Sequence, residues 1–195
     1  MTEKVGANGR PEFTARETSI RGLVTLKRFG HTDSRGSFSR IFNLADLSPF
    51  GWPSKTQQVN FSSTARRGTI RGMHAQSGST PEYKIVTCVR GAVWDVAVDL
   101  RADSETFLRW EAVELSESNF LSFLIPPGVA HGFQSLSDDA ALLYCHSAPY
   151  EPDFEVGVSP FDPIISISWP LEVTSISDRD SEHQPLSSDF KGLPI

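Results

Sequence analysis

The segment KIVTCVRGAVWDVAVDL, residues 84–100, decides the fold class. It holds two runs rich in β-branched and other apolar residues, 84–89 and 92–100, separated by Arg90-Gly91. Such runs are typical of strands, and the Arg-Gly step between them predicts a tight hairpin. Side chains alternate across a strand, so the second run has two faces. One face holds Trp94, Val96, Val98 and Leu100, and the other holds Val93, Asp95, Ala97 and Asp99.

Shorter runs of the same kind lie on both sides of this segment, with turn residues between them. They cover residues 21–29, 37–43, 57–62, 69–76, 107–115, 120–125, 132–136, 140–146 and 164–169. Many short strands indicate a sandwich or barrel. Helical signals are confined to residues 44–47 and the end of the chain. The sequence predicts an all-β, double-sheet jelly roll over residues 21–187, between a flexible N-terminal tail (1–20) and a C-terminal tail (188–195).

Composition narrows the functional class. The chain has 195 residues, 38% of them hydrophobic, and a formal net charge of −6. These values fit one soluble globular domain and argue against binding to nucleic acid or to an anionic membrane surface. No apolar run is long enough to span a membrane, and the N-terminus lacks the apolar core of a signal peptide. We expect a cytoplasmic protein in which Cys88 and Cys145 are reduced and buried.

Polar residues recur at alternate positions of several predicted strands. One such residue indicates a solvated face, but several strands together favour a polar-lined cavity, a common ligand site in β barrels. The residues are Gln58, Asn60, Arg71, Lys84, Asp95, Asp99, Tyr144 and His146.

Two further features concern the five histidines. The segment IPPGVAHGF, residues 125–133, places His131 after a turn, as at the pocket mouth of cupin-type barrels; a packed histidine is the alternative. The chain has no His-x-His pair, so we expect no metal site, although distant residues could still assemble one. We expect His31 and His183 to be solvated, and His146 to pack or to lie at the pocket rim.

His74, in RGMHAQ, is suited to acid–base chemistry because imidazole exchanges protons near neutral pH. A base that removes a proton beside a carbonyl needs a carboxylate partner and cations or donors for the enolate oxygen. Lys84, His131 and Arg71 are available as donors, and Tyr144 as an acid. Spacing alone leaves open whether these residues meet.

Taken together, eight motifs resemble the dTDP-4-dehydrorhamnose 3,5-epimerase family, nucleotide-sugar epimerases with a cupin-like jelly roll. The resemblance covers about residues 21–187, with the motifs in the family's order. They are DSRGSF (33–38), QQVNFS (57–62), TIRGMHAQ (69–76), YKIVTCVRGAVWDVAVDLRADSETF (83–107), IPPGVAHGF (125–133), LLYCHSAPYEP (142–152), FDPIISISWP (161–170) and ISDRD (176–180).

The resemblance implies a role for each matching residue. His74 matches the general base, Asp180 its carboxylate, Tyr144 the proton donor, and Lys84 and His131 the residues that steady the enolate oxygen. The implied substrate-binding residues are Arg35, Arg40, Gln58, Asn60, Arg71, Asp95, Glu155 and Arg179. In many members the residue at Arg35 reaches the nucleotide diphosphate of the neighbouring subunit.

The implied function is epimerisation of a nucleoside-diphosphate 4-keto-6-deoxyhexose at C3, C5 or both, in deoxysugar biosynthesis, by a cofactor-free homodimer. Epimerisation at a single carbon, 3,4-ketoisomerisation and non-catalytic binding of a sugar nucleotide are the alternatives. Departures from the family pattern leave the sugar and the nucleotide open. They are Arg40 for glutamate, Val59 for a polar residue, Ala75 for a bulky aromatic, and Phe161-Asp162 for a Trp-containing stretch.

Overall fold

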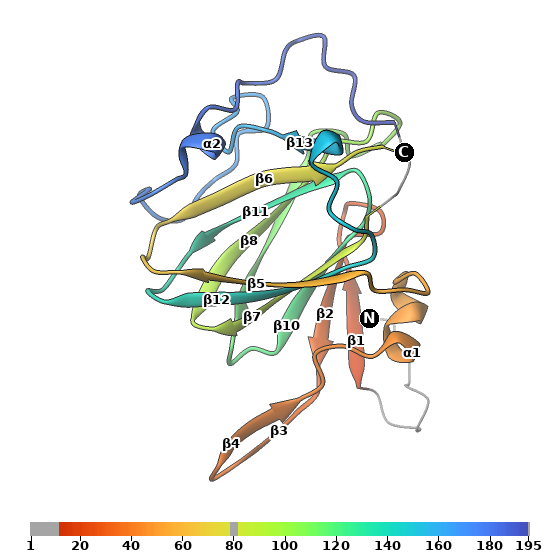
Figure 1. The fold of residues 1–195 in the computed structure, drawn as a ribbon, viewed down its shortest axis with the longest axis vertical. Coiled ribbons are helices and arrows are strands. Elements are labelled where there is room, and N and C mark those ends of the chain that lie inside the picture. Colours follow the sequence, from red (N-terminus) through yellow and green to blue (C-terminus); the bar gives the residue numbers. More distant parts are fainter. Residues whose placement is uncertain (1–11, 79–81, 195) are drawn as a thin grey trace.

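The computed structural model describes residues 12–78 and 82–194. Two antiparallel sheets pack face to face as the predicted cupin-like double-sheet jelly roll (Figure 1). The six-stranded sheet has the order β1 (Phe13–Glu17), β2 (Val24–Arg28), β10 (Leu121–Ile125), β7 (Lys84–Arg90), β12 (Ala140–His146) and β5 (Gln58–Thr64). The five-stranded sheet has the order β13 (Glu155–Gly157), β6 (Ile70–Gln76), β11 (Val129–Ser135), β8 (Ala92–Asp99) and β9 (Trp110–Ser116).

A separate hairpin projects away from these sheets (Figure 1). It consists of β3 (Gly30–Asp33) and β4 (Gly36–Ser39), which form a two-stranded sheet. Phe38 on this hairpin is 75% exposed. A large apolar side chain on a protruding arm is a candidate contact surface for another molecule.

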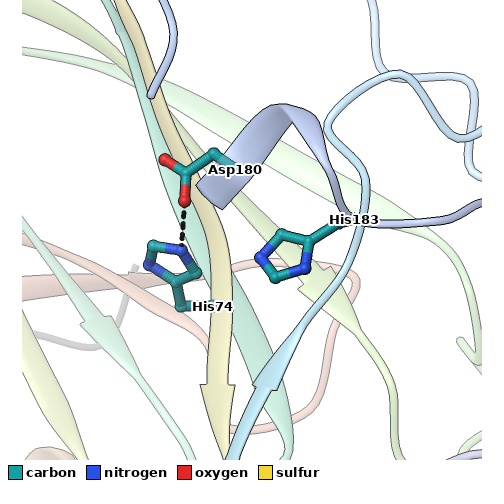
Figure 2. Close-up of side chains that lie close together, drawn as sticks. All are labelled: His74, Asp180 and His183. Atoms are coloured by element: carbon teal, nitrogen blue, oxygen red, sulfur yellow. Dashed lines mark hydrogen bonds and ion pairs between the residues drawn. The ribbon is translucent and has the colours of Figure 1, made fainter. Parts of the chain in front are cut away.

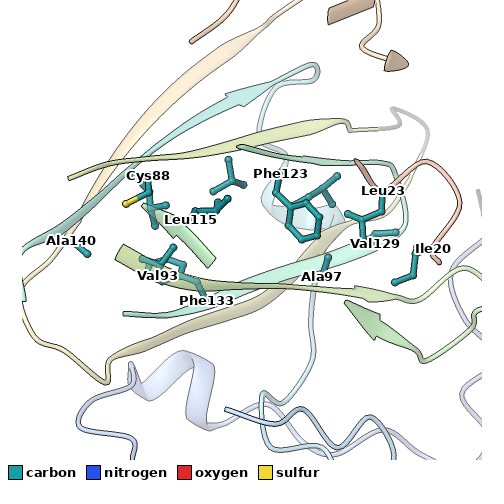
Figure 3. Packing of buried hydrophobic residues seen from close by; sticks show 13 residues of the cluster. Ile20, Leu23, Cys88, Val93, Ala97, Leu115, Phe123, Val129, Phe133 and Ala140 are labelled. Atoms are coloured by element: carbon teal, nitrogen blue, oxygen red, sulfur yellow. The ribbon is translucent and has the colours of Figure 1, made fainter. Parts of the chain in front are cut away.

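The main core lies between the two sheets (Figure 3). Val93 and Ala97 of β8 belong to it, which confirms the alternation expected for that strand. The opposite face of β8 packs under an outer layer that includes Val158 and Ile165. The core residues are Ile20, Leu23, Val86, Cys88, Val93, Ala97, Leu115, Phe123, Ile125, Val129, Phe133, Ala140 and Leu142.

The predicted hairpin at Arg90-Gly91 is wrong. β7 pairs with β10 and β12, whereas β8 pairs with β11 and β9, so the chain passes here from one sheet to the other. Gly91 has φ +71°, and a Cβ there would overlap the Ser137 side chain. A glycine therefore suits a crossing as well as a hairpin, and local sequence does not distinguish the two.

Residues 164–169 form no strand. Ser166 has φ +52°, and the Asp162 carboxylate accepts hydrogen bonds from the N–H groups of Ile164 and Ile165. The alternating apolar side chains of this stretch, among them Ile165, pack on the outer layer instead of pairing in a sheet. β13, the edge strand of the five-stranded sheet next to β6, was not predicted.

Both predicted tails contain ordered packing. Phe13, only 2% exposed, belongs to β1, which pairs with β2 along its whole length. At the other end Leu193 is buried and Phe190 stacks on Phe107. The part of the N-terminal prediction that falls on residues 1–11 lies outside the described residues. Charged residues between the apolar ones hid the edge strand β1.

Short helices and cysteines agree with prediction. The helical turns are α1 (Leu44–Leu47), capped by the Asn43 side chain, and α2 (Asp178–Ser181), capped by Ser177. Cys88 and Cys145 are free and buried. Within residues 12–78 and 82–194, no helix has the length and apolar character needed to cross a membrane.

Candidate active site

A cavity of about 820 Å³ opens between the two sheets. Its walls come from β5, β7 and β12 of the large sheet and from β6 and β11 of the small one, with the segment around α2 at one side. This volume is typical of small-molecule sites. The predicted site residues that line it are Asn60, Arg71, His74, Lys84, His131, Tyr144, Arg179 and Asp180.

His74 and Asp180 form a hydrogen-bonded pair in this cavity (Figure 2). The His74 Nε2 atom lies 2.7 Å from Asp180 Oδ1, and the Gly72 N–H donates to Asp180 Oδ2 at 3.1 Å. Burial opposes ionisation of Asp180, but the hydrogen bonds from His74 and Gly72 outweigh it and lower the pKa of the carboxyl. An ionised Asp180 accepts a hydrogen bond from the Nε2–H of His74. The neutral ring then carries its lone pair on Nδ1.

Gly72 makes this pairing possible. The pairing of β6 with β11 shifts register between His131 and Phe133, because Gly72 and Met73 of β6 form a bulge opposite Gly132. Gly72 has φ +110°, and a Cβ there would lie 2.6 Å from Gly132 Cα. Glycine alone tolerates this close approach. The bulge directs the Gly72 N–H toward Asp180, and bulges beside functional sites commonly redirect groups in this way.

Tyr144 enters the cavity from β12, on the opposite sheet. Its hydroxyl lies 3.3 Å from the Ser62 hydroxyl, and its ring stacks on His146 with centroids 6.1 Å apart. The His131 ring meets Tyr144 edge-on. Burial raises the pKa of the Tyr144 hydroxyl, so the phenol stays protonated over the ordinary pH range.

Glu82 supports the wall beside Tyr144 and was missed in the sequence. Its Oε1 accepts a hydrogen bond from His146 Nδ1 at 2.8 Å, and its Oε2 lies 3.8 Å from Lys84 Nζ. Burial opposes ionisation, but His146 and the charge of Lys84 lower the pKa of Glu82. Its position two residues before Lys84 was the available signal, because alternate residues share a face.

Asp95 contacts the His131 ring on the side away from the cavity. Its Nε2 lies 3.0 Å from both carboxylate oxygens of Asp95, whose side chain is fully buried. Burial raises the pKa of Asp95, while His131 opposes the shift. Asp95 therefore lies outside the cavity lining and orients His131, although the sequence placed it among the binding residues.

Three further predicted residues lie at or near the cavity. The Gln58 Nε2 donates to Asn60 Oδ1 at 3.1 Å, and Arg71 donates to the carbonyl of Ser63 at 3.1 Å. Asn60 Nδ2 lies 3.5 Å from His146 Nε2, which places His146 in a polar network at the cavity rim. Gln58, Asn60 and His146 are thus oriented by one another, and Arg71 by a backbone carbonyl.

Glu155 and Arg179 form an ion pair beside His74. The Tyr150 hydroxyl donates to Glu155 Oε2 at 2.6 Å. Burial opposes ionisation of Glu155, but the hydrogen bonds from Tyr150 and Arg179 lower its pKa. Arg179 lines the cavity, whereas Glu155 supports it from outside the lining.

Arg35 and Arg40 are not brought to this cavity. Arg35 sits at the turn of the β3–β4 hairpin, with its side chain 88% exposed and paired with Asp33 at 2.6 Å. Arg40 pairs with Asp46 at 3.4 Å, near α1. Figure 1 shows the hairpin pointing away from the sheets that form the cavity.

His183 is the second histidine beside Asp180, and the prediction that it is solvated is wrong. Its Nε2 is buried, and its ring meets the His74 ring edge-on with centroids 6.1 Å apart (Figure 2). The spacing of three residues from Asp180, on a segment that begins as a helix, was the signal for this contact. His31 is exposed, as predicted.

Comparisons with known proteins agree on one family. Residues 17–188 match the sequence model described as dTDP-4-dehydrorhamnose 3,5-epimerase. The protein of that name from Mycolicibacterium smegmatis is 42% identical over 90% of this chain and 87% of its own length. The one from Methanothermobacter thermautotrophicus is 39% identical over 90% of this chain and 95% of its own length. The dTDP-6-deoxy-D-glucose-3,5-epimerase of Legionella pneumophila, solved with dTDP-4-keto-L-rhamnose, superposes with TM-score 0.85 at 34% identity, over 93% of this chain and 97% of that one.

Proposed function

The chain belongs to the dTDP-4-dehydrorhamnose 3,5-epimerase family and is an epimerase of a nucleoside-diphosphate 4-keto-6-deoxyhexose; from that premise we propose which residues carry the reaction. The observation that carries the proposal is the 2.7 Å contact between His74 Nε2 and Asp180 Oδ1 in the cavity that Tyr144 also lines. The nucleotide is dTDP, as in the ligand of the Legionella pneumophila structure.

His74 is the base. The C4 ketone of the substrate acidifies the hydrogens on C3 and C5, and His74 Nδ1 has the lone pair that accepts one of them. Asp180 holds the ring in this tautomer and stabilises the imidazolium that forms, the general arrangement for a histidine base. This chemistry requires neither a redox cofactor nor a metal.

Lys84 and His131 stabilise the enolate. Charge moves to the C4 oxygen as the proton leaves, and preorganised cations or donors lower the energy of that state. Lys84, held near Glu82, and His131, held by Asp95, both line the cavity. Each donor thus has a carboxylate behind it that fixes its position before substrate arrives.

Tyr144 returns a proton to the other face of the sugar. The phenol gives its proton to the carbanionic carbon as the enolate collapses to the ketone, which inverts that carbon. His74 then holds the substrate's proton and Tyr144 lacks one, and exchange with solvent restores both. The charge of Arg71 opposes the effect of burial on Tyr144 and favours the transient phenolate.

The sugar and the diphosphate bind to guanidinium and amide donors, which suit hydroxyl and phosphate oxygens. These donors belong to Arg71, Asn60, Gln58 and Arg179. Arg35 and Arg40 lie outside the cavity of their own chain, so a contact with the nucleotide requires the cavity of a second copy. We place Arg35, at the tip of the hairpin, in the neighbouring subunit's nucleotide site within a homodimer. The exposed Phe38 beside it supplies apolar contact for such a dimer.

Solvent exchange tests the reaction. The protein is incubated in heavy water with dTDP-4-keto-6-deoxyglucose, and NMR follows deuterium at C3 and C5. We expect label at both carbons; label at one makes the chain a single-carbon epimerase. His74→Asn should slow exchange about 10²–10⁴-fold and retain nucleotide binding, whereas His31→Asn should exchange normally. Undiminished exchange in His74→Asn, or binding without exchange in the wild type, would overturn the proposal.

A further inference from the structure

We propose that His74, Asp180 and His183 also form a binding site for a divalent transition-metal ion such as Zn²⁺, and that the bound ion switches off His74 as a base. Two imidazoles and one carboxylate are preferred ligands of such ions. Each residue offers one ligand atom, and the three atoms lie within 4.8 Å of one another. Figure 2 shows the two rings and the carboxylate facing a common point.

The buried nitrogen of His183 is an independent sign of a ligand. In the described part of the chain His183 Nε2 is buried and has no hydrogen-bond partner. Buried polar atoms are normally satisfied, so an unpartnered one calls for a missing partner. The ring packs against the Gly157 backbone of β13, where a Cβ would overlap it. Figure 2 shows this ring beside His74, near the Asp180 carboxylate.

The required geometry is close to the one observed. Zinc bonds of about 2.0–2.2 Å in a tetrahedron place ligand atoms about 3.4 Å apart. The 2.7 Å contact between His74 Nε2 and Asp180 Oδ1 must lengthen slightly, and His183 must move inward. The nearby charge of Arg179 is offset by its ion pair with Glu155. Three protein ligands leave the fourth position for a water or a substrate oxygen.

Metal binding at Nε2 removes the basic lone pair of His74. In the free protein Nε2 carries the ring proton and Nδ1 the lone pair. When the ion takes Nε2, the single proton of the neutral ring resides on Nδ1, which then accepts no proton from substrate. The ion also takes the carboxylate that stabilises the imidazolium. No oxidation change is involved, so removal of the ion by a chelator restores the base.

Binding is measured directly. Protein freed of metal with EDTA is dialysed and titrated with Zn²⁺ against a chromophoric chelator. We expect one ion per wild-type chain. His183→Ala should bind at least about tenfold more weakly, since even loss of a residue that only supports a ligand commonly costs 10–100-fold. His31→Ala, which removes an exposed histidine, should bind as the wild type does. Absence of stoichiometric binding, or equal affinity in His183→Ala, would overturn the site.

The inhibitory effect is a second readout, and it rests on the proposed role of His74. Zn²⁺ should suppress deuterium exchange in the wild type and EDTA should restore it. His183→Ala and His183→Gln, checked for folding by thermal melting, should exchange without metal and resist Zn²⁺. Zinc binding that leaves exchange unchanged refutes the switch. If no form of the protein exchanges, the epimerase proposal fails, and the chelator titration alone decides the metal site.

Discussion

His74 and Tyr144 reach the same cavity from opposite sheets, His74 on β6 of the five-stranded sheet and Tyr144 on β12 of the six-stranded one. A sugar ring between them presents one face to each residue. Inversion of a carbon requires that one proton leave from one face and another arrive at the other. The two-layer architecture therefore supplies the stereochemical requirement of an epimerase.

Replacing Tyr144 should separate exchange from inversion. In Tyr144→Phe we expect inversion to slow about 10²-fold or more, because the acid on one face is gone. His74 still removes and returns protons on its own face, so deuterium enters faster than the product forms. NMR of label and product gives the ratio. Tyr83→Phe, outside the cavity lining, is the control. Inversion at the wild-type rate would assign the donor to another group.

Arg35 should act across a dimer. We expect Arg35→Ala to lose about tenfold or more in kcat/KM, as for other charge-assisted phosphate contacts. Co-expression of Arg35→Ala and His74→Asn chains with different tags yields a hybrid dimer. If Arg35 serves the neighbouring site, the hybrid has one intact site and about half the wild-type activity. If Arg35 serves its own chain, both sites of the hybrid are defective and activity stays low.

Asp99 anchors a loop outside the cavity, although its strand position predicted a pocket residue. Burial opposes its ionisation, but Arg101, Ser104 and Thr106 donate hydrogen bonds and lower its pKa to about 2 from 3.8. The shift corresponds to about 2 kcal/mol of stability, present above about pH 4 and lost as pH falls toward 2.

Asp99→Asn should therefore cost about 2 kcal/mol in urea unfolding at pH 7, and the difference from wild type should shrink at pH 3. The exposed Asp103→Asn should change stability by less than about 0.5 kcal/mol. An equal cost at both pH values would show that packing, not ionisation, accounts for the effect.

Gly72 and Gly36 form a matched pair for testing the bulge. Both have positive φ, +110° and +128°. A Cβ at Gly72 meets Gly132 and His131, whereas one at Gly36 meets no atom of the described residues within 4 Å. We expect Gly72→Ala to abolish exchange and to lower stability by several kcal/mol, and Gly36→Ala to cost only about 1 kcal/mol from backbone strain. Similar stability losses would mean that the close approach is unimportant. The measurements are urea unfolding and deuterium exchange.

Most strands were predictable because their sequences alternate or are continuously apolar. The pairing between strands was less predictable than the strands themselves. The crossing at Arg90-Gly91 and the unpaired stretch 164–169 depend on which distant segments cover each face, and apolar alternation looks the same in a strand and in a packed loop.

The residues of the candidate site were likewise only partly predictable from the sequence. Motif resemblance located His74, Asp180, Tyr144, Lys84 and His131, all of which line one cavity. It gave no sign of Glu82 or of the buried nitrogen of His183, because their importance comes from contacts formed only in the folded chain. Motif resemblance also proposed Arg35 and Arg40 as binding residues, but in the folded chain both lie outside the cavity.

The hydrogen bond between His74 and Asp180 joins residues 106 positions apart in the chain. During synthesis, β6 with its histidine leaves the ribosome long before α2 exists. A growing chain that has formed the strands thus has the imidazole before it has the carboxylate that orients it and the segment that forms one side of the cavity. Catalytic competence therefore depends on docking of the segment around α2, which follows the last strand of both sheets along the chain.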